Sequence, residues 1–168
     1  DLARKVLGGV VSAVGDAVGA AREFEKQLGA VDTLLVGSTS ANIEALRSDL
    51  LALDDRLGSA AGLTDALYQA LSSGVEAGKS VEFVGEAAKL ASAGLGDLGG
   101  TVDLLTTVLN AYGLQADQSA HVSEVLFEAV KVGKTTIEEL SGSLGRVIPT
   151  AKGAGIEIGA GDHSFDAR

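Results

Sequence analysis

The sequence predicts an all-α protein in which a long N-terminal heptad helix precedes a bundle of short helices separated by glycines. Apolar residues recur at intervals of three and four along most of the chain, and this spacing is typical of one buried face of a helix. The segments with this spacing end at glycines, which are common just after the last turn of a helix. We therefore expect about six or seven helices and no sheet of more than two short strands.

The most regular pattern lies in residues 1–36, which we interpret as a helix that packs lengthwise on other helices. The neighbouring positions are apolar in the first half of this segment, for example at Val11 and Val18, and polar in the second half. We expect an oligomer interface along the apolar seam. The alternative is a first helix covered by the rest of its own domain. The seam consists of Leu7, Val10, Val14, Ala17, Ala21, Phe24, Leu28, Val31 and Leu35.

Residues 37–152 form the predicted helical core. Hydroxyl residues stand before several of its apolar segments, as N-caps do. Ser80 and Thr101 are expected to begin two helices, and Thr135 with Glu138 is expected to form a capping box that opens the last one. Pro149 should kink or end that last helix, because its ring removes a backbone donor. The earlier segments end at Gly58, Gly74, Gly94, Gly113 and Gly133.

The last segment, residues 153–168, is rich in glycine and has no helical period. We expect it to be a loosely ordered tail. The other end of the chain begins at Asp1 without a convincing signal sequence, so we expect an internal fragment of a longer protein.

The composition excludes several classes of function. Lys and Arg number 13 against 23 Asp and Glu, which gives a net charge of −10, and no basic block offers a surface for phosphate groups. We therefore expect no nucleic-acid binding. The chain has no cysteine, which excludes disulfides, thiolate metal sites and thiol nucleophiles.

Neither of the two histidines belongs to a convincing site. His121 and Glu124 lie three residues apart on a predicted helix, but no third or fourth metal ligand accompanies them. His163 lies between Asp162 and Ser164 in the predicted tail. Catalytic geometry cannot be held by neighbours in such a segment, because triads are assembled from distant parts of a fold.

One glycine-containing stretch imitates a phosphate-binding loop. Gly133, Lys134 and Thr135 match the end of that motif, but Glu128 stands where its first glycine is required. We therefore predict no catalytic, cofactor-binding or metal-binding residues, and no cofactor.

Several stretches in sequence order resemble the core region of phage tail tape measure proteins. The resemblance extends over roughly residues 20–155, and the chain departs from the family pattern in residues 156–168. It rests on Ala66–Gly74, Glu86–Gly94, Leu105–Leu114, Val122–Phe127, Val130–Thr136, Glu138–Leu140, Ser143–Val147 and Pro149.

The resemblance implies a structural protein of the virion that runs inside the tail tube, sets the length of the tube during assembly and leaves with the genome. It also implies a parallel trimer of the N-terminal helix, and contacts with tail tube and tail tip or baseplate proteins. A membrane-active helical segment that helps genome passage is the alternative function, with host membrane contact at ejection. The resemblance carries no catalytic residues, which disfavours a peptidoglycan hydrolase.

Overall fold

The computed structural model describes residues 2–35, 40–53, 57–94 and 96–158, and for residues 2–14, 40 and 41 it describes the backbone alone. All regular structure in these ranges is helical, which confirms the all-α prediction. The seven described α-helices are α1 (Leu2–Leu34), α2 (Ser40–Leu51), α3 (Ala60–Ser72), α4 (Ala77–Gly94), α5 (Leu98–Tyr112), α6 (Ser119–Gly133) and α7 (Ile137–Gly153), and the 3₁₀ helix η2 (Ala116–Gln118) precedes α6.

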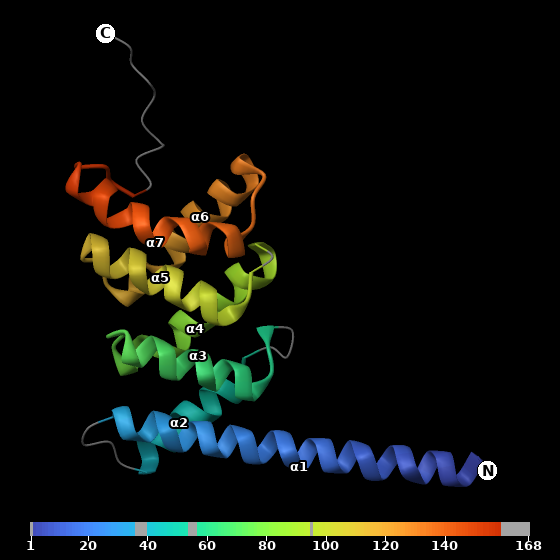
Figure 1. Cartoon of the computed structure of the whole chain (residues 1–168). Coiled ribbons are helices and arrows are strands. Elements are labelled where there is room, and N and C mark those ends of the chain that lie inside the picture. Colours follow the sequence, from blue (N-terminus) through green and yellow to red (C-terminus); the bar gives the residue numbers. More distant parts are fainter. Residues whose placement is uncertain (1, 36–39, 54–56, 95, 159–168) are drawn as a thin grey trace.

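The helices stack in two layers (Figure 1). One layer contains α1, α3, α5 and α7 in sequence order, and each of them contacts the next. The second layer contains α2, α4 and α6, again in order. The chain therefore zigzags between the layers, and the helices of the first layer all point in the same direction. This is a helical ladder, in which each α-helix of the core packs mainly on its near neighbours along the chain.

One apolar cluster runs between the layers and includes residues from all seven helices. Phe83 on α4 and Leu105 on α5 are fully buried at its centre. Small residues let α4 approach its neighbours closely, because Gly85, Ala87 and Ala88 are buried along it. This dense packing explains how a chain with few aromatic residues builds a continuous core.

Three helices of the first layer end in the same way. The helices α3, α5 and α7 are followed by Gly74, Gly113 and Gly155, whose φ angles are +94°, +68° and +78°. The residue after each glycine donates its N–H to the carbonyl five residues earlier, at 2.8–3.0 Å. This is the Schellman motif, which requires a left-handed residue and therefore favours glycine.

Two predicted N-caps lie elsewhere than expected. Ser80 stands inside α4, where its hydroxyl donates to the carbonyl of Ala77 at 2.7 Å. Because a hydroxyl near the start of a helix can satisfy an earlier carbonyl as well as a free N–H, the residue type alone did not fix the boundary. At the start of α7 the cap is shifted by one residue, since Thr136 rather than Thr135 accepts from the N–H of Glu139 at 3.2 Å.

Two predicted helix ends were also wrong. The helix α2 ends at Leu51 rather than at Gly58, and the N–H of Leu53 then bonds the carbonyl of Leu50 in a tighter turn. The helix α7 does not end at Pro149 but continues to Gly153. Pro149 and the residue one turn before it are exposed, so water can satisfy the carbonyl that loses its partner.

Candidate interaction surfaces

The predicted seam divides into two parts along α1. In the second half, Phe24, Leu28 and Val31 are buried, and Leu35 packs against the core. The covering element is α3, which lies along this half of α1. The second half of the seam is thus used inside the chain.

The first half of α1 extends past the other helices (Figure 1). Ala17 and Ala21 are exposed, as is every residue from 15 to 23. Val18 is 46% exposed, and a Cβ placed at Gly15 or Gly19 would meet no atom within 4 Å. No described residue of the chain covers this apolar stretch. The seam positions Leu7, Val10 and Val14 lie outside the residues whose side chains are described.

The middle of α1 is fixed by polar contacts with α2. Arg47 on α2 forms an ion pair with Glu25, with 2.5 Å between its Nη2 and the Oε1 of the carboxylate. The same guanidinium lies over the ring of Phe24, 5.8 Å from the ring centre. These contacts begin where the exposed half of α1 ends, so α1 is held by the fold only along its second half.

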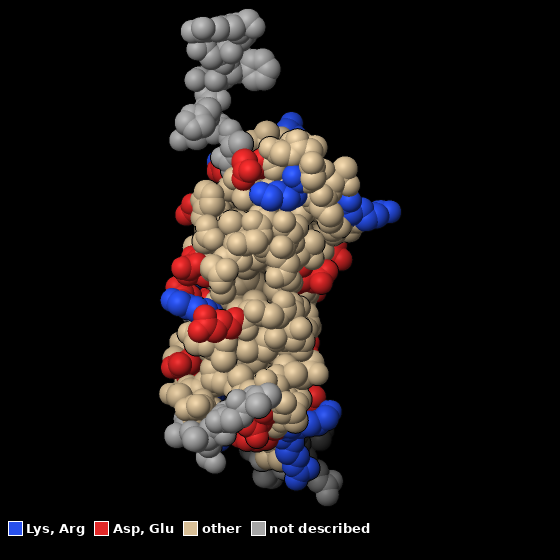
Figure 2. All heavy atoms as spheres, turned by 90° about the vertical axis from the view of Figure 1, so that its left-hand side faces the viewer, with Lys and Arg blue, Asp and Glu red and all other residues tan. Residues whose placement is uncertain are grey.

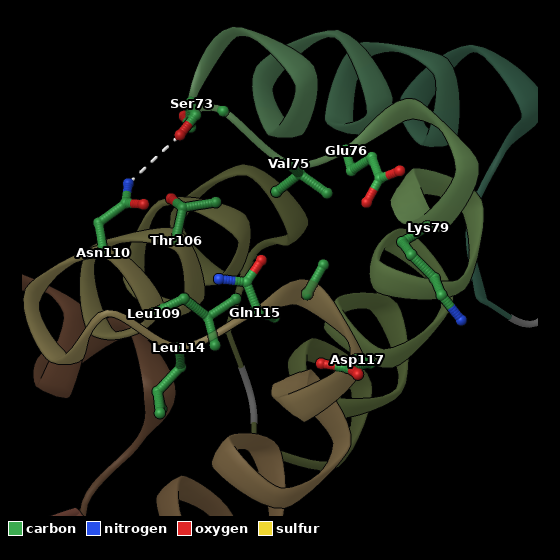
Figure 3. A pocket seen from close by; sticks show the side chains of 12 residues that line it. Ser73, Val75, Glu76, Lys79, Thr106, Leu109, Asn110, Leu114, Gln115 and Asp117 are labelled. Carbon is green, nitrogen blue, oxygen red and sulfur yellow. Dashed lines mark hydrogen bonds between the residues drawn. The ribbon is translucent and has the colours of Figure 1, made fainter.

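A hollow of about 300 Å³ opens where α3 and α5 end and α4 begins. Figure 3 shows the side chains that line it, including Val75 and Leu109, with Asn110 reaching across to the end of α3. The Nδ2 of Asn110 donates to the carbonyl of Ser73 at 3.2 Å. Since the twelve lining residues include neither histidine nor cysteine, the hollow lacks the usual base and nucleophile of a catalytic site. Its contents suit packing between layers.

A shallower groove of about 200 Å³ lies between α4 and α6. Its walls include Leu90 and Phe127, and Phe127 is 38% exposed. The buried hydroxyl of Ser123 also lines the groove and has no hydrogen-bond partner. An ion pair between Lys89 and Glu86, at 2.7 Å, lies on its rim.

The surface charges are mostly solvated. Figure 2 shows the face at which α3, α5 and α7 end, where uncharged atoms dominate the middle and acidic groups gather toward an edge. Most ion pairs join residues three apart on one helix and are exposed, for example Lys131 with Glu128 at 3.0 Å. Such pairs contribute little to stability and mark no binding site.

One carboxylate has a clear structural role. Asp97 caps α5, which therefore begins at Leu98 and not at Thr101, and the Oδ1 of Asp97 accepts from the N–H of Gly100 at 2.8 Å. This backbone hydrogen bond lowers the pKa of Asp97 below its ordinary value, and a hydrogen bond with the side chain of Glu138 adds to the effect. Burial opposes it.

The histidines add no chemistry to this picture. His121 is exposed on α6, and no group of three metal-ligating side chains occurs among the described residues. His163, with Asp162 and Ser164, lies outside the described residues. Among the helices described, none has both the length and the apolar character needed to cross a membrane.

Together, these features define a protein that packs on other helices: a two-layer ladder with an exposed apolar helix at one end. The comparisons with known proteins agree with this class. Residues 47–160 match the sequence model of the phage-related minor tail protein family. Because the match covers more than half of the chain, the chain belongs to this family, and the predicted relationship to phage tail proteins is confirmed.

A curated relative extends the match toward the N-terminus. The chain is 33% identical over 159 residues to a "Probable tape measure protein" of Clostridium phage phiCD119. The alignment covers 89% of this chain but only 17% of the relative, so the chain spans about a sixth of the length of that protein. No solved structure matches the chain.

Proposed function

We propose that this chain is a segment of a tape measure protein, which occupies the lumen of the phage tail tube, sets tube length during assembly and remains there until the genome is ejected. The observation that carries the proposal is the 33% identity, over nearly the whole chain, to a probable tape measure protein. The family match to minor tail proteins supports the same role.

The physical character of the chain fits a passage that DNA later occupies. Its net charge of −10 repels phosphate groups, so the protein should not bind the genome that follows it through the tube. Its helices stack along one direction (Figure 1), and α1 alone has 33 residues, or about 50 Å at 1.5 Å per residue. An elongated, acidic and helical body is suited to a narrow tube.

Self-association is the second part of the proposal. The second half of the seam is covered by α3, so the contact between copies falls to the first half, at Leu7, Val10, Val14, Ala17 and Ala21. A parallel bundle of three helices is the arrangement we favour, because it matches a tail with rotational symmetry. Tail tube proteins and tail tip or baseplate proteins are the other proposed partners.

The length of assembled tails tests the ruler function. A second copy of residues 40–153 is inserted in frame into the full-length protein of the phage, and tails are measured by electron microscopy. These 114 residues would lengthen the tail by up to about 170 Å if they become fully helical and extended in the tube. Tails of unchanged length would refute the ruler, provided that the longer protein is found in the virion. An insertion of half the size, residues 97–153, should give half the increase.

A further inference from the structure

The ladder contains a structural repeat that is complete twice and open once. The helices α3, α5 and α7 can be aligned at the glycines that end them, Gly74, Gly113 and Gly155. Each glycine is followed by an apolar residue, and each helix points in the same direction (Figure 1). Equivalent positions of the three helices can therefore be compared directly.

The position eight residues before each glycine shows the difference. It holds Ala66 on α3, Leu105 on α5 and Val147 on α7. Ala66 is 1% exposed and Leu105 is fully buried, whereas Val147 is 55% exposed. An apolar residue thus stands at the same place in all three helices, but only on α7 is it open to water.

The position just after each glycine gives the same result. Val75 and Leu114 are half-buried and pack against the core, whereas Ile156 is 58% exposed. The neighbouring position, occupied on α7 by Ile148, is buried in all three helices. The side of α7 that faces its own core is therefore covered, and a second apolar side is left uncovered.

The order of the helices explains this difference. The helix α3 is followed by α4, and α5 by α6, and each of these second-layer helices packs on the first-layer helices before and after it. Within the described residues, no such helix follows α7. Val147 and Ile156 accordingly mark an open place for one more helix at this end of the ladder, which we call the α7 end.

We propose that the first half of α1 from a second copy of this chain occupies the α7 end. This half of α1 is an apolar helix that no described residue of its own chain covers. It is also rich in small residues, with glycine at positions 8, 9, 15 and 19. The second-layer helix α4 has the same character, with Gly85, Ala87 and Ala88 buried against its neighbours.

Such a contact joins two different surfaces, one from each copy, and so forms head-to-tail assemblies that either close into rings or continue. It rests on the proposed self-association through α1 and specifies what the helix contacts. A helix that is apolar on a wide arc can offer Val18 and its neighbours to the α7 end. A bundle of α1 helices through the seam is the competing arrangement.

Disulfide trapping separates the two arrangements, because the chain has no cysteine of its own. One variant carries Gly19→Cys on α1, where a side chain meets no atom within 4 Å. The other carries Ser143→Cys, an exposed position one turn before Val147, and has an added tag that makes it distinguishable by mass. The two variants are mixed, oxidised under mild conditions and analysed by mass under non-reducing conditions.

We expect the mixed α1–α7 dimer to exceed either homodimer several-fold. Adding Val147→Asp to the Ser143→Cys chain should reduce the mixed dimer at least tenfold, while the circular dichroism spectrum stays helical, because the substituted side chain is exposed. Leu51→Asp is the matched control, since Leu51 is also 55% exposed but lies on α2, and it should leave the mixed dimer unchanged.

Three results would overturn the proposal. If only Gly19→Cys homodimers form, the copies associate through α1 in a bundle, so the self-association stands and the docking at the α7 end is wrong. If no dimer forms and sedimentation shows a monomer, both are wrong. A mixed dimer that survives Val147→Asp would show that α1 lies near α7 without using this apolar surface.

Discussion

The contact between Gly94 and Ile137 should determine how firmly the last unit of the ladder is attached. Ile137 begins α7 and is 1% exposed, and its side chain lies against the last residue of α4. A Cβ at Gly94 would overlap the Cγ1 of Ile137 and would lie 3.3 Å and 3.4 Å from its Cδ1 and Cβ. At Gly96 a Cβ would be 2.7 Å from the Cγ2 of the same residue. Ile137 is thus enclosed by two glycines.

Gly94→Ala should therefore destabilise the protein. Overpacking of a filled core costs about 1–3 kcal/mol, and the gain from alanine in a helix offsets up to about 1 kcal/mol. We expect a net loss of about 1–2 kcal/mol, or a fall in Tm of about 2–8 °C for a chain of this length. Gly85→Ala is the matched control, because its Cβ would lie 3.5 Å from Leu53, an ordinary contact. It should be neutral or slightly stabilising.

A double-mutant cycle with Ile137→Ala tests the cause of the loss. Ile137→Ala alone should cost about 2–5 kcal/mol, because it empties a buried site. With the isoleucine side chain removed, Gly94→Ala should no longer be harmful, and the two changes should be non-additive by at least about 1 kcal/mol. The measurement is urea unfolding followed by circular dichroism. If Gly94→Ala costs the same in both backgrounds, the steric explanation is wrong.

Two further predictions concern the cap of α5 and the assembly through α1. Asp97→Ala should lose about 0.5–2 kcal/mol at pH 7, and Asp97→Asn much less. The hydrogen bond from the Gly100 N–H lowers the pKa of Asp97 in the folded state. Its stabilising effect is therefore present above the ordinary pKa near 3.8 and is lost as the pH falls through the lower folded value. Urea unfolding of Asp97→Ala and the unaltered protein should thus converge in acid, and a difference that persists at pH 2 would contradict this. Val14→Asp should abolish oligomers in analytical ultracentrifugation and leave residues 60–150 helical, because a buried unpaired charge in the contact is costly, and Leu51→Asp is its control. An oligomeric Val14→Asp variant, or an unaltered protein that is monomeric at high concentration, would show that α1 does not join the copies.

The helices themselves were predictable because their signals are local. The 3–4 spacing of apolar residues and the glycines that follow α3, α5 and α6 lie within single segments of the chain, and helix formation depends on such local patterns. The order of the two layers was not predictable in this way. It depends on contacts such as that between Gly94 and Ile137, in which a glycine is needed because of a side chain more than 40 residues away.

The open position at the α7 end also lies beyond sequence periodicity. Val147 and Leu105 occupy equivalent apolar positions on two helices, and the apolar spacing treats them alike. One is exposed and the other buried because α6 follows α5, whereas no described helix follows α7. Aligning the helices at their terminal glycines would have related the two residues, but it could not have shown which of them is covered.

The seam of α1 shows how an apolar pattern can have two different partners. Its spacing is the same at Ala17 and Ala21 as at Leu28 and Val31, yet the former pair is exposed and the latter is buried. Spacing states only that one face of a helix is apolar. The neighbouring positions carry the missing information, because a helix covered by α3 on one side needs polar residues on its other sides, and the second half of α1 has them. The apolar neighbours of the first half, such as Val18, indicate that a larger part of that half is meant to be buried. Since no described residue of the chain buries it, the change in these neighbours marks where contacts within the chain end and contacts between copies should begin.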